Sequence, residues 1–487
     1  MAIRLSGLAS NMDTESIVAE LMSAQRMKKT KIENKKTKTE WAQEKWKTLN
    51  SKLYSFYKNS LSKMRLQSSF LTKSVTSSDE SKVKATATSD SASGTHTLKI
   101  NNLASAQFVT GAQLGSTTTG KTKLTELGLT AGEGNKITIT NGGKTQSIEI
   151  TEDTTINDLV KSLKNAGINA SFDASQKRLF LSSKESGSTN AFTISSEGSV
   201  NLNSIGLGTN AKTVAAADAE FEYNGATMTS SSNNVTVNGI KLNLIGTTGS
   251  DTITLNIAND TQAVYDMIKD FVKGYNEVLT EMNEAYHASN AKGYDPLTDD
   301  QKNAMTDEQV ENWESKIKDS LLRRDGTLSS LIGSLRNTMS RSVAYDNKSQ
   351  YLASFGIVTT DYTERGLLHI NGDKDDQTVS DLDNDLMTAL TNDPDKVMTV
   401  FTKLAGDLYS DLADKMKSTT MRSALTFYND KEMKKQVENY QDDIDKLEKK
   451  LNDMESRYYK QFTAMEKAMS QMNSQSNYLT SMLGGNS

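Results

Sequence analysis

The last roughly fifty residues of the chain carry apolar side chains at alternating steps of four and three. This spacing places them on one face of an α-helix and predicts a coiled-coil seam. The seam consists of Met433, Val437, Tyr440, Ile444, Leu447, Leu451, Met454 and Tyr458, and it continues through Phe462, Met465, Met469, Met472 and Leu479. From Leu451 to Phe462 the steps run three, four and four, a stutter that locally unwinds a left-handed coil. A helix of about fifty residues is about 75 Å long, so we expect it to pack on another helix.

A second helix is predicted near the start of the chain. Asp13 is a residue type that caps helix N-termini, and apolar side chains follow it at Ile17, Leu21 and Ala24. Apolar residues at helical spacing then resume further along, at Trp46, Leu49, Leu53 and Phe56. Both ends of the chain are therefore expected to form coiled-coil arms.

The stretch of residues 26–38 between these apolar runs is basic, with Glu33 as its only acid. A solvated helix face is one interpretation and a nucleic-acid surface is another, but no stacking aromatics or recognition motif support the latter. A third interpretation is pairing with the C-terminal helix, which carries seven acidic residues between 438 and 455. Salt screening keeps each exposed pair of this kind weak.

The middle of the chain has the composition of a β-domain. It is rich in Ser, Thr, Asn and Gly, and Met228 is the only methionine between residues 65 and 260. Hairpins are predicted around residues 141–144 and around Asn238-Gly239, because Asn-Gly supplies both positive φ angles of a type I′ turn. A short helix is expected to begin at Thr155, followed by a hairpin of residues 168–173 with 178–182.

Helical spacing returns at Thr261 and continues through further helices after a loop at residues 294–297. The only interruption expected is a hairpin of residues 355–360 with 366–370. Another helix should begin at Pro394, since proline favours the first helical position.

These patterns predict an α+β multidomain fold with terminal coiled-coil helices, a helical-bundle stalk and an inserted, mostly antiparallel β head in nested discontinuous layers. The predicted layers are terminal coiled-coil arms of residues 1–40 with 436–487, a helical stalk domain with a small hairpin of residues 41–70 with 261–435, a first β head domain of residues 71–110 with 213–260, and a second α+β head domain of residues 111–212.

Composition excludes several kinds of chemistry. The chain has 487 residues and no cysteine, so it can form neither a disulfide nor a thiolate metal site. His96, His287 and His369 lie far apart with no HExxH, GxSxG or Walker motif around them, and we interpret them as ordinary surface or core histidines. We expect no enzymatic activity, no cofactor and no metal. The net charge of −5 disfavours a general polyanion binder, and no apolar run is long enough to span a membrane or resembles a secretory signal.

Several short segments of the chain are similar in sequence to segments of one known protein family. Residues 7–14, followed by Ser16, Ile17 and Val18, are similar to one family's opening signature, with Asn11 where many relatives have glycine. Residues 296–299, 393–397, 457–462 and 472–475 match the same family. With the nested plan, these segments resemble the flagellar filament cap family, also called hook-associated protein 2 or FliD. The resemblance covers the whole chain and is densest at its ends.

The resemblance implies a non-enzymatic protein, secreted to the extracellular tip of the bacterial flagellum, that caps the filament. A ring of identical subunits, about five, would promote folding and insertion of exported flagellin and prevent its leakage. The implied partners are flagellin, further copies of the chain, hook-filament junction proteins, and an export chaperone with the flagellar export apparatus; no nucleic acid is implied. The expected filament-docking and oligomer interface consists of Leu5, Leu8, Met12, Ile17, Leu21, Leu447, Leu451, Met454, Tyr458, Phe462, Met465, Met469, Met472 and Leu479.

Other functions stay open at this point. The chain could be a sibling axial protein, either flagellin or a hook-filament junction protein, although the wording of residues 7–14 favours the cap. The β head could bind a host glycan as an adhesin, a role that can coexist with capping. An enzyme on the head is disfavoured because no nucleophile, base and orienting group stand out together.

Overall fold

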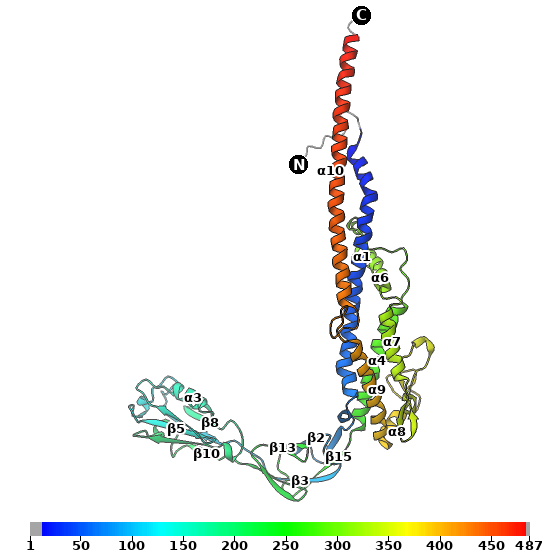
Figure 1. The fold of residues 1–487 in the computed structure, drawn as a ribbon. Coiled ribbons are helices and arrows are strands. Elements are labelled where there is room, and N and C mark those ends of the chain that lie inside the picture. The colour runs from blue at the N-terminus through cyan, green and yellow to red at the C-terminus, as the bar shows by residue number, and fades with distance from the viewer. Residues whose placement is uncertain (1–11, 484–487) are drawn as a thin grey trace. The chain divides into compact units, whose positions relative to one another are not determined.

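The computed structural model describes residues 12–483 and divides into two compact units. The outer unit contains the chain up to Phe70 and again from Val264 onward, and the inserted unit is Leu71–Ala263 (Figure 1). The outer unit is mainly helical and the inserted unit mainly antiparallel sheet. The predicted α+β class, with terminal helices and a discontinuous chain path around an inserted β region, is confirmed.

Nine α-helices, four of them long, form most of the outer unit within the described residues. They are α1 (Thr14–Phe56), α2 (Ser62–Met64), α4 (Thr261–His287), α5 (Asp299–Asn303), α6 (Asp307–Ser320), α7 (Gly326–Met339), α8 (Asp385–Asn392), α9 (Pro394–Lys415) and α10 (Asp430–Leu483). A π-helical turn, Tyr57–Leu61, joins α1 to α2. The predicted start of α9 at Pro394 is confirmed, with the Asp393 side chain accepting from the Lys396 N–H at 3.2 Å.

The helix α1 is continuous where the sequence pattern suggested two separate helical runs. Its polar middle is supported by ion pairs one turn apart, Lys29 with Glu33 at 3.4 Å and Lys36 with Glu40 at 3.5 Å. Apolar periodicity is therefore not needed to hold this part helical. The predicted layer boundaries at 40/41 and 435/436 both fall inside single helices, α1 and α10, so the four-layer division stays a prediction.

Two small hairpins interrupt the helices of the outer unit, and only one was expected. The pair β18 (Ile357–Val358) and β19 (His369–Ile370) confirms the hairpin predicted within residues 355–370, with shorter strands. The pair β16 (Val343–Tyr345) and β17 (Lys348–Gln350) was missed. Its turn uses Asp346 and Asn347, at φ 49° and 59°, so it lacks the Asn-Gly signal that marks such turns most clearly.

One buried apolar cluster holds the outer unit together. It joins the C-terminal half of α1 to α4, α7, α8 and α9, and its most enclosed aromatic side chains include Tyr275, Phe355 and Phe401. Trp46 of α1 belongs to the same cluster and stacks on Tyr428, with ring centroids 5.5 Å apart. The helical pattern of α1, α4 and α9 thus faces one shared core.

The inserted unit contains two separate apolar cores. Two sheets enclose the first core, in the orders β1-β15-β3-β11-β12 and β13-β14-β2. Their strands are β1 (Lys73–Ser77), β2 (Val83–Ala87), β3 (Gly94–Asn102), β11 (Ala219–Tyr223), β12 (Ala226–Ser230), β13 (Asn234–Val237), β14 (Ile240–Leu244) and β15 (Ile253–Asn259). Each strand pairing among them is antiparallel.

The second core of the inserted unit lies between α3 and two further sheets, ordered β10-β4-β8-β7 and β6-β5-β9. The elements are β4 (Phe108–Thr110), β5 (Lys136–Asn141), β6 (Lys144–Glu149), α3 (Ile156–Asn165), β7 (Asn169–Asp173), β8 (Arg178–Ser182), β9 (Phe192–Glu197) and β10 (Lys212–Val214). The predicted short helix and the hairpin after it are confirmed as α3 and β7-β8, and Thr155 caps α3 in a capping box with Asp158.

Both predicted tight turns of the inserted unit are confirmed. Asn141 pairs with Lys144 across Gly142 and Gly143, at φ 55° and 76°. The hairpin β13-β14 turns at Asn238 and Gly239, at φ 49° and 79°. Both turns have two successive left-handed residues, the requirement of a type I′ turn.

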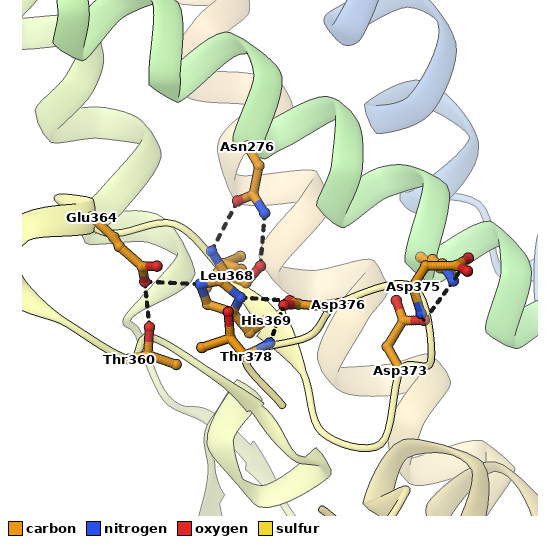
Figure 2. Close-up of polar contacts among 10 residues, drawn as sticks. Asn276, Thr360, Glu364, Leu368, His369, Asp373, Asp375, Asp376 and Thr378 are labelled. Carbon is orange, nitrogen blue, oxygen red and sulfur yellow. Dashed lines mark hydrogen bonds and ion pairs between the residues drawn. The ribbon is translucent and has the colours of Figure 1, made fainter. Parts of the chain in front are cut away.

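A histidine clasp fastens the segment between β18 and α8 in the outer unit (Figure 2). His369 is only 8% exposed, and its Nδ1 and Nε2 lie 2.6 Å from Asp376 Oδ2 and 2.9 Å from Glu364 Oε2. The Thr360 hydroxyl donates to the same Glu364 oxygen, and the Thr378 N–H donates to Asp376 Oδ1 at 3.0 Å. His369 is therefore a structural residue that bridges two carboxylates.

The helix α4 holds the same segment from the other side. The Asn276 side chain donates to the Leu368 carbonyl at 2.7 Å and accepts from the Leu368 N–H at 2.8 Å (Figure 2). Lys269 lies 2.6 Å from both Asp373 Oδ1 and Asp375 Oδ2. Backbone and side-chain contacts together anchor this irregular segment on a regular helix.

Lowering the pH and removing the His369 side chain are both expected to weaken its contacts with Glu364 and Asp376. The pKa of Glu364 lies below its usual value, mainly because Thr360 donates to it. Burial acts to raise the pKa of Asp376, but hydrogen bonds from His369 and Thr378 outweigh it and lower that pKa. Since both folded-state pKa values lie below the unfolded ones, this stabilisation is complete above about pH 4.5 and disappears as pH falls through the folded-state values.

We therefore predict that His369→Gln lowers the free energy of unfolding by about 1 kcal/mol at pH 7, because one of the two half-buried carboxylates loses one of its donors. The loss should be smaller near pH 3, where the carboxyl groups are protonated. Urea unfolding at both pH values measures it, and His287→Gln, at an exposed histidine of α4, is the control. An equal loss at both pH values would assign the effect to packing instead.

Candidate docking surface on the terminal helices

The N-terminal helix begins at the predicted cap. Asp13 Oδ1 accepts from the N–H groups of Glu15 and Ser16 at 3.2 and 3.0 Å, and the Ser16 hydroxyl donates to Oδ2 at 2.7 Å. The hydrogen bonds from Ser16 lower the pKa of Asp13, so the cap stays ionised in mildly acidic solution. The predicted cap is confirmed, and it fixes the residue at which α1 begins.

A side chain of α1 holds the residues that come just before the C-terminal helix. The Asn50 side chain accepts from the Phe427 N–H at 2.8 Å and donates to the Leu425 carbonyl at 3.3 Å, just before α10 begins. Burial acts to raise the pKa of Asp430, but hydrogen bonds from Ser423 outweigh it, and the pKa is lowered. The two helices then run antiparallel along each other (Figure 1).

A small apolar cluster joins the far part of this helix pair. Val18 and Met22 of α1 are fully buried against Leu451. Half-buried side chains of α10 complete the cluster, namely Met454, Tyr458, Tyr459 and Phe462. Four residues expected at an interface, Leu451, Met454, Tyr458 and Phe462, are thus brought together, and they pack on the chain's own α1.

The face of α1 that packs on α10 differs from the one expected. The sequence pattern selected Ile17, Leu21 and Ala24, whereas Thr14, Val18 and Met22 are buried. Leu21 is 45% exposed and Ile17 is half-buried. Steps of four from Thr14 through Val18 to Met22 were the missed signal, which was ambiguous because the next helical position, Gln25, is polar. Two adjacent apolar stripes share this helix, and contact with α10 selects one of them.

Of the other residues expected at the docking interface, some are half-buried and others are exposed to solvent. Leu447, Met465 and Met469 of α10 are half-buried, while Met12 is 40% exposed. Leu5 and Leu8 lie outside the described residues.

The predicted pairing between basic and acidic segments is present at two points. Arg26 lies 3.3 Å from Glu455, and Lys29 lies 3.8 Å from Glu448. Both pairs are partly exposed, so each contributes at most about 1 kcal/mol. The two pairs are consistent with the register in which Val18 and Met22 pack on Leu451.

Past Met469, α10 continues without burying its apolar side chains. Met472 is 66% exposed, Leu479 56%, Tyr478 61% and Met482 66%. Met472 and Leu479 continue the seam that packs on α1 further back, and Figure 1 shows α10 extending beyond the start of α1. Four large apolar side chains exposed on about three helical turns are typical of a binding surface.

Two other kinds of site were searched for among the described residues. Between residues 12 and 483, no three histidine, aspartate or glutamate side chains are arranged to hold a metal ion. No helix in the same range is both long and apolar enough to cross a membrane.

Paired terminal helices, an inserted antiparallel β unit and an uncovered apolar helix end are the features of a structural protein. Residues 216–474 match the family model described as flagellar hook-associated protein 2 C-terminus, and residues 10–107 match the corresponding N-terminus model. The chain belongs to the flagellar hook-associated protein 2 family. This confirms the family recognised from the terminal segments, and because it is a family of structural flagellar proteins, the prediction of a non-enzymatic protein is also confirmed.

Relatives match along the full length of the chain. Flagellar hook-associated protein 2 of Halalkalibacterium halodurans is 27% identical over 97% of this chain and 98% of its own length. The protein of the same name from Escherichia coli K12 is 27% identical over 99% of this chain and 98% of its own. The crystal structure of the D1-D2-D3 domains of the Escherichia coli flagellar cap protein FliD covers 81% of this chain and 99% of that one, at a TM-score of 0.54 and 22% identity. That likeness shows a shared fold.

Proposed function

We propose that this chain caps the distal end of the bacterial flagellar filament. As a ring of identical subunits, it promotes folding and insertion of exported flagellin and prevents its leakage. Family membership supports this role, as does the name flagellar cap protein carried by a relative of the same fold. The main structural support is that Met472 and Leu479, near the end of α10, continue the apolar seam beyond its contact with α1 and are exposed.

The free seam suits a partner that changes during growth. Burying its four exposed side chains stabilises a docked state, since each fully buried large apolar side chain contributes about 1.5–3 kcal/mol. Two of the four are methionines, Met472 and Met482, whose unbranched side chains adapt to differently shaped neighbours. We infer that this segment docks among helices at the filament end each time a flagellin is added.

The partners follow from this role. They are flagellin, about five copies of the chain, the hook-filament junction proteins and, on the way out of the cell, an export chaperone with the flagellar export apparatus. An unfolded chain passes an export channel more readily without disulfides and with few prolines, and this chain has no cysteine and two prolines. The protein is then extracellular. A host glycan would bind the inserted unit, where Phe108 and Phe180 are exposed and could stack on a sugar ring.

The test replaces Leu479 by Asp, which puts a charge on the free seam without touching the cluster around Met22 and Leu451. We expect the variant to be exported and folded, but to be lost from filament tips, with unpolymerised flagellin in the medium. Labelled protein counted at tips and flagellin assayed in the supernatant measure this. Asn477→Asp, at an exposed position of the same helix on another face, is the control. Normal capping by Leu479→Asp would contradict the docking role.

A further inference from the structure

Four asparagines of the chain are followed directly by glycine, namely Asn141, Asn224, Asn238 and Asn371. In such a pair the backbone nitrogen of the glycine can attack the side-chain carbonyl carbon of the asparagine, because glycine has no Cβ to obstruct the approach. The attacking nitrogen gives up its proton, ammonia leaves, and a five-membered succinimide ring closes. Water then opens this ring to aspartate or to isoaspartate. The reaction consumes only water and needs no oxidant.

The reaction requires an asparagine side chain that is able to turn toward the following nitrogen. A side-chain amide that is held by hydrogen bonds must break them first, and a glycine N–H that is already donating must release its acceptor. Hydrogen bonds at each pair therefore decide which of the four positions reacts, although all four have the same two residues.

Two of the four pairs are engaged in hydrogen bonds. The Asn141 side chain donates to the Gly167 carbonyl at 3.1 Å. At Asn371 the attacking nitrogen, that of Gly372, donates to the Val379 carbonyl at 2.9 Å. One reacting group of each pair is thus held in place.

The other two asparagines, Asn224 and Asn238, occupy the same backbone geometry in the inserted unit. Each is the first residue of a two-residue hairpin turn, between β11 and β12 for Asn224 and between β13 and β14 for Asn238. Both have φ 49°, and the glycines that follow, Gly225 and Gly239, have φ 81° and 79°. Both asparagines are exposed. Backbone conformation and exposure therefore do not distinguish them.

The contacts of the two side chains differ. Asn224 Oδ1 accepts from the Thr97 N–H at 2.9 Å, and Asn224 Nδ2 lies 3.0 Å from His96 Nδ1, so β3 holds both ends of the amide. The Asn238 side chain makes no hydrogen bond with any other described residue. Its carbonyl carbon is free to approach the Gly239 nitrogen, whereas that of Asn224 is not.

We propose that Asn238 is the site at which this protein is spontaneously deamidated, and that Asn224, in the same turn geometry, is protected by its contacts with β3. The modification needs no partner and is independent of the proposed function. It is irreversible in water, so the modified fraction grows with the age of the molecule.

The modification changes how the β13-β14 turn packs. The Gly239 carbonyl accepts from the Thr88 N–H at 3.1 Å, and a Cβ on Gly239 would lie 2.8 Å from Thr88 Oγ1 and 2.9 Å from Ser91 Oγ. Aspartate at position 238 adds only a negative charge. Isoaspartate also lengthens the backbone by one methylene group, which displaces the Gly239 carbonyl from Thr88. We expect the hairpin to loosen, while the second core, which shares no residue with the first, stays unchanged.

Incubation of the full-length protein at neutral pH and physiological temperature tests the site. Mass spectrometry of its peptides measures deamidation, and isoaspartate is assayed in the same peptides. We expect Asn238 to react at least about tenfold faster than each of the other three, the factor given by a barrier difference of about 1.4 kcal/mol. The same protein in concentrated urea is the control. There all four side chains are released, so the rates at Asn224 and Asn238 should become similar.

Two variants test the physical cause. His96→Ala removes one of the two contacts that hold Asn224, and it should speed the reaction at Asn224 several-fold without changing the rate at Asn238. Asn238→Asp carries the charge of the product without the longer backbone. Hydrogen exchange of β14 should therefore be faster in the isoaspartate fraction of aged protein than in Asn238→Asp.

Equal rates at Asn224 and Asn238 in the folded protein would overturn the proposal, as would no reaction at Asn238. A rate difference that persists in urea would assign the selectivity to neighbouring residues in sequence and not to the fold, and this outcome also overturns it. An unchanged rate at Asn224 in His96→Ala contradicts protection by that contact. Unchanged exchange of β14 in the isoaspartate fraction contradicts the loosening of the hairpin.

Discussion

Replacing Phe462 by Asp should separate α1 from α10 over their far half. Phe462 is half-buried against the cluster of Val18, Met22 and Leu451, so a charged carboxylate there is partly desolvated and loses the apolar contact. The expected cost is about 2–4 kcal/mol, more than a cluster of three buried side chains can offset. In dilute solution, hydrogen exchange of residues 14–25 and 451–466 should become fast. In cells, the protein should be made and exported but should not be retained at the filament tip.

Gln461→Asp is the matched control, since it places the same charge on the adjacent exposed position of α10. Unchanged exchange in Phe462→Asp would contradict the helix pairing of this structure. The comparison with Leu479→Asp is informative as well. Phe462→Asp should release the arms and abolish capping, whereas Leu479→Asp should abolish capping with the arms still paired.

Phe401→Ala is expected to cause the largest loss of stability. Its ring is 2% exposed and lies between Phe70 and Phe355, with centroids 6.4 and 5.9 Å away. Truncation leaves a cavity in the large cluster that joins α1 to α4, α7, α8 and α9, at a cost of about 3–5 kcal/mol. The chain's three tryptophans, Trp41, Trp46 and Trp313, all belong to the outer unit, so their fluorescence follows its unfolding in urea.

The inserted unit should be unaffected by Phe401→Ala, because its two cores share no residue with the damaged cluster. Hydrogen exchange of β5 and β14 at low urea tests this. Tyr362→Ala, at a side chain that is 90% exposed in the same outer unit, serves as the control and should change the free energy of unfolding little. If the β strands exchange faster in Phe401→Ala, the two units do not unfold independently.

Local chemistry explains which elements were predictable. The turn at Asn238 and Gly239, the capping box at Thr155 and the start of α9 at Pro394 each depend on residues next to one another in sequence. The continuity of α1 and the β16-β17 hairpin were not predictable in this way. In α1 the polar middle is held by ion pairs and neighbouring helices, and the hairpin turn at Asp346 and Asn347 lacks glycine.

The docking surface was predictable only in part. The seam from Leu451 to Leu479 follows from its spacing, because helical periodicity needs no knowledge of the partner. Which of its residues are covered does not follow. Phe462 packs on the chain's own α1, while Leu479 remains exposed. This division depends on where α1 begins along α10, and that position is set by long-range packing.

The class of fold, the helical ends, the inserted antiparallel region and the family could be predicted, because each is encoded in local spacing, turn residues or recognisable segments. The packing of the two long helices was needed to show that Val18 and Met22, and not Ile17 and Leu21, face α10. It also decided that Arg26 and Lys29 pair within the chain while Lys28, Lys31 and Lys35 face outward. The physical reason is that one helix with two adjacent stripes can bury either, and the choice is made by the register of the partner helix.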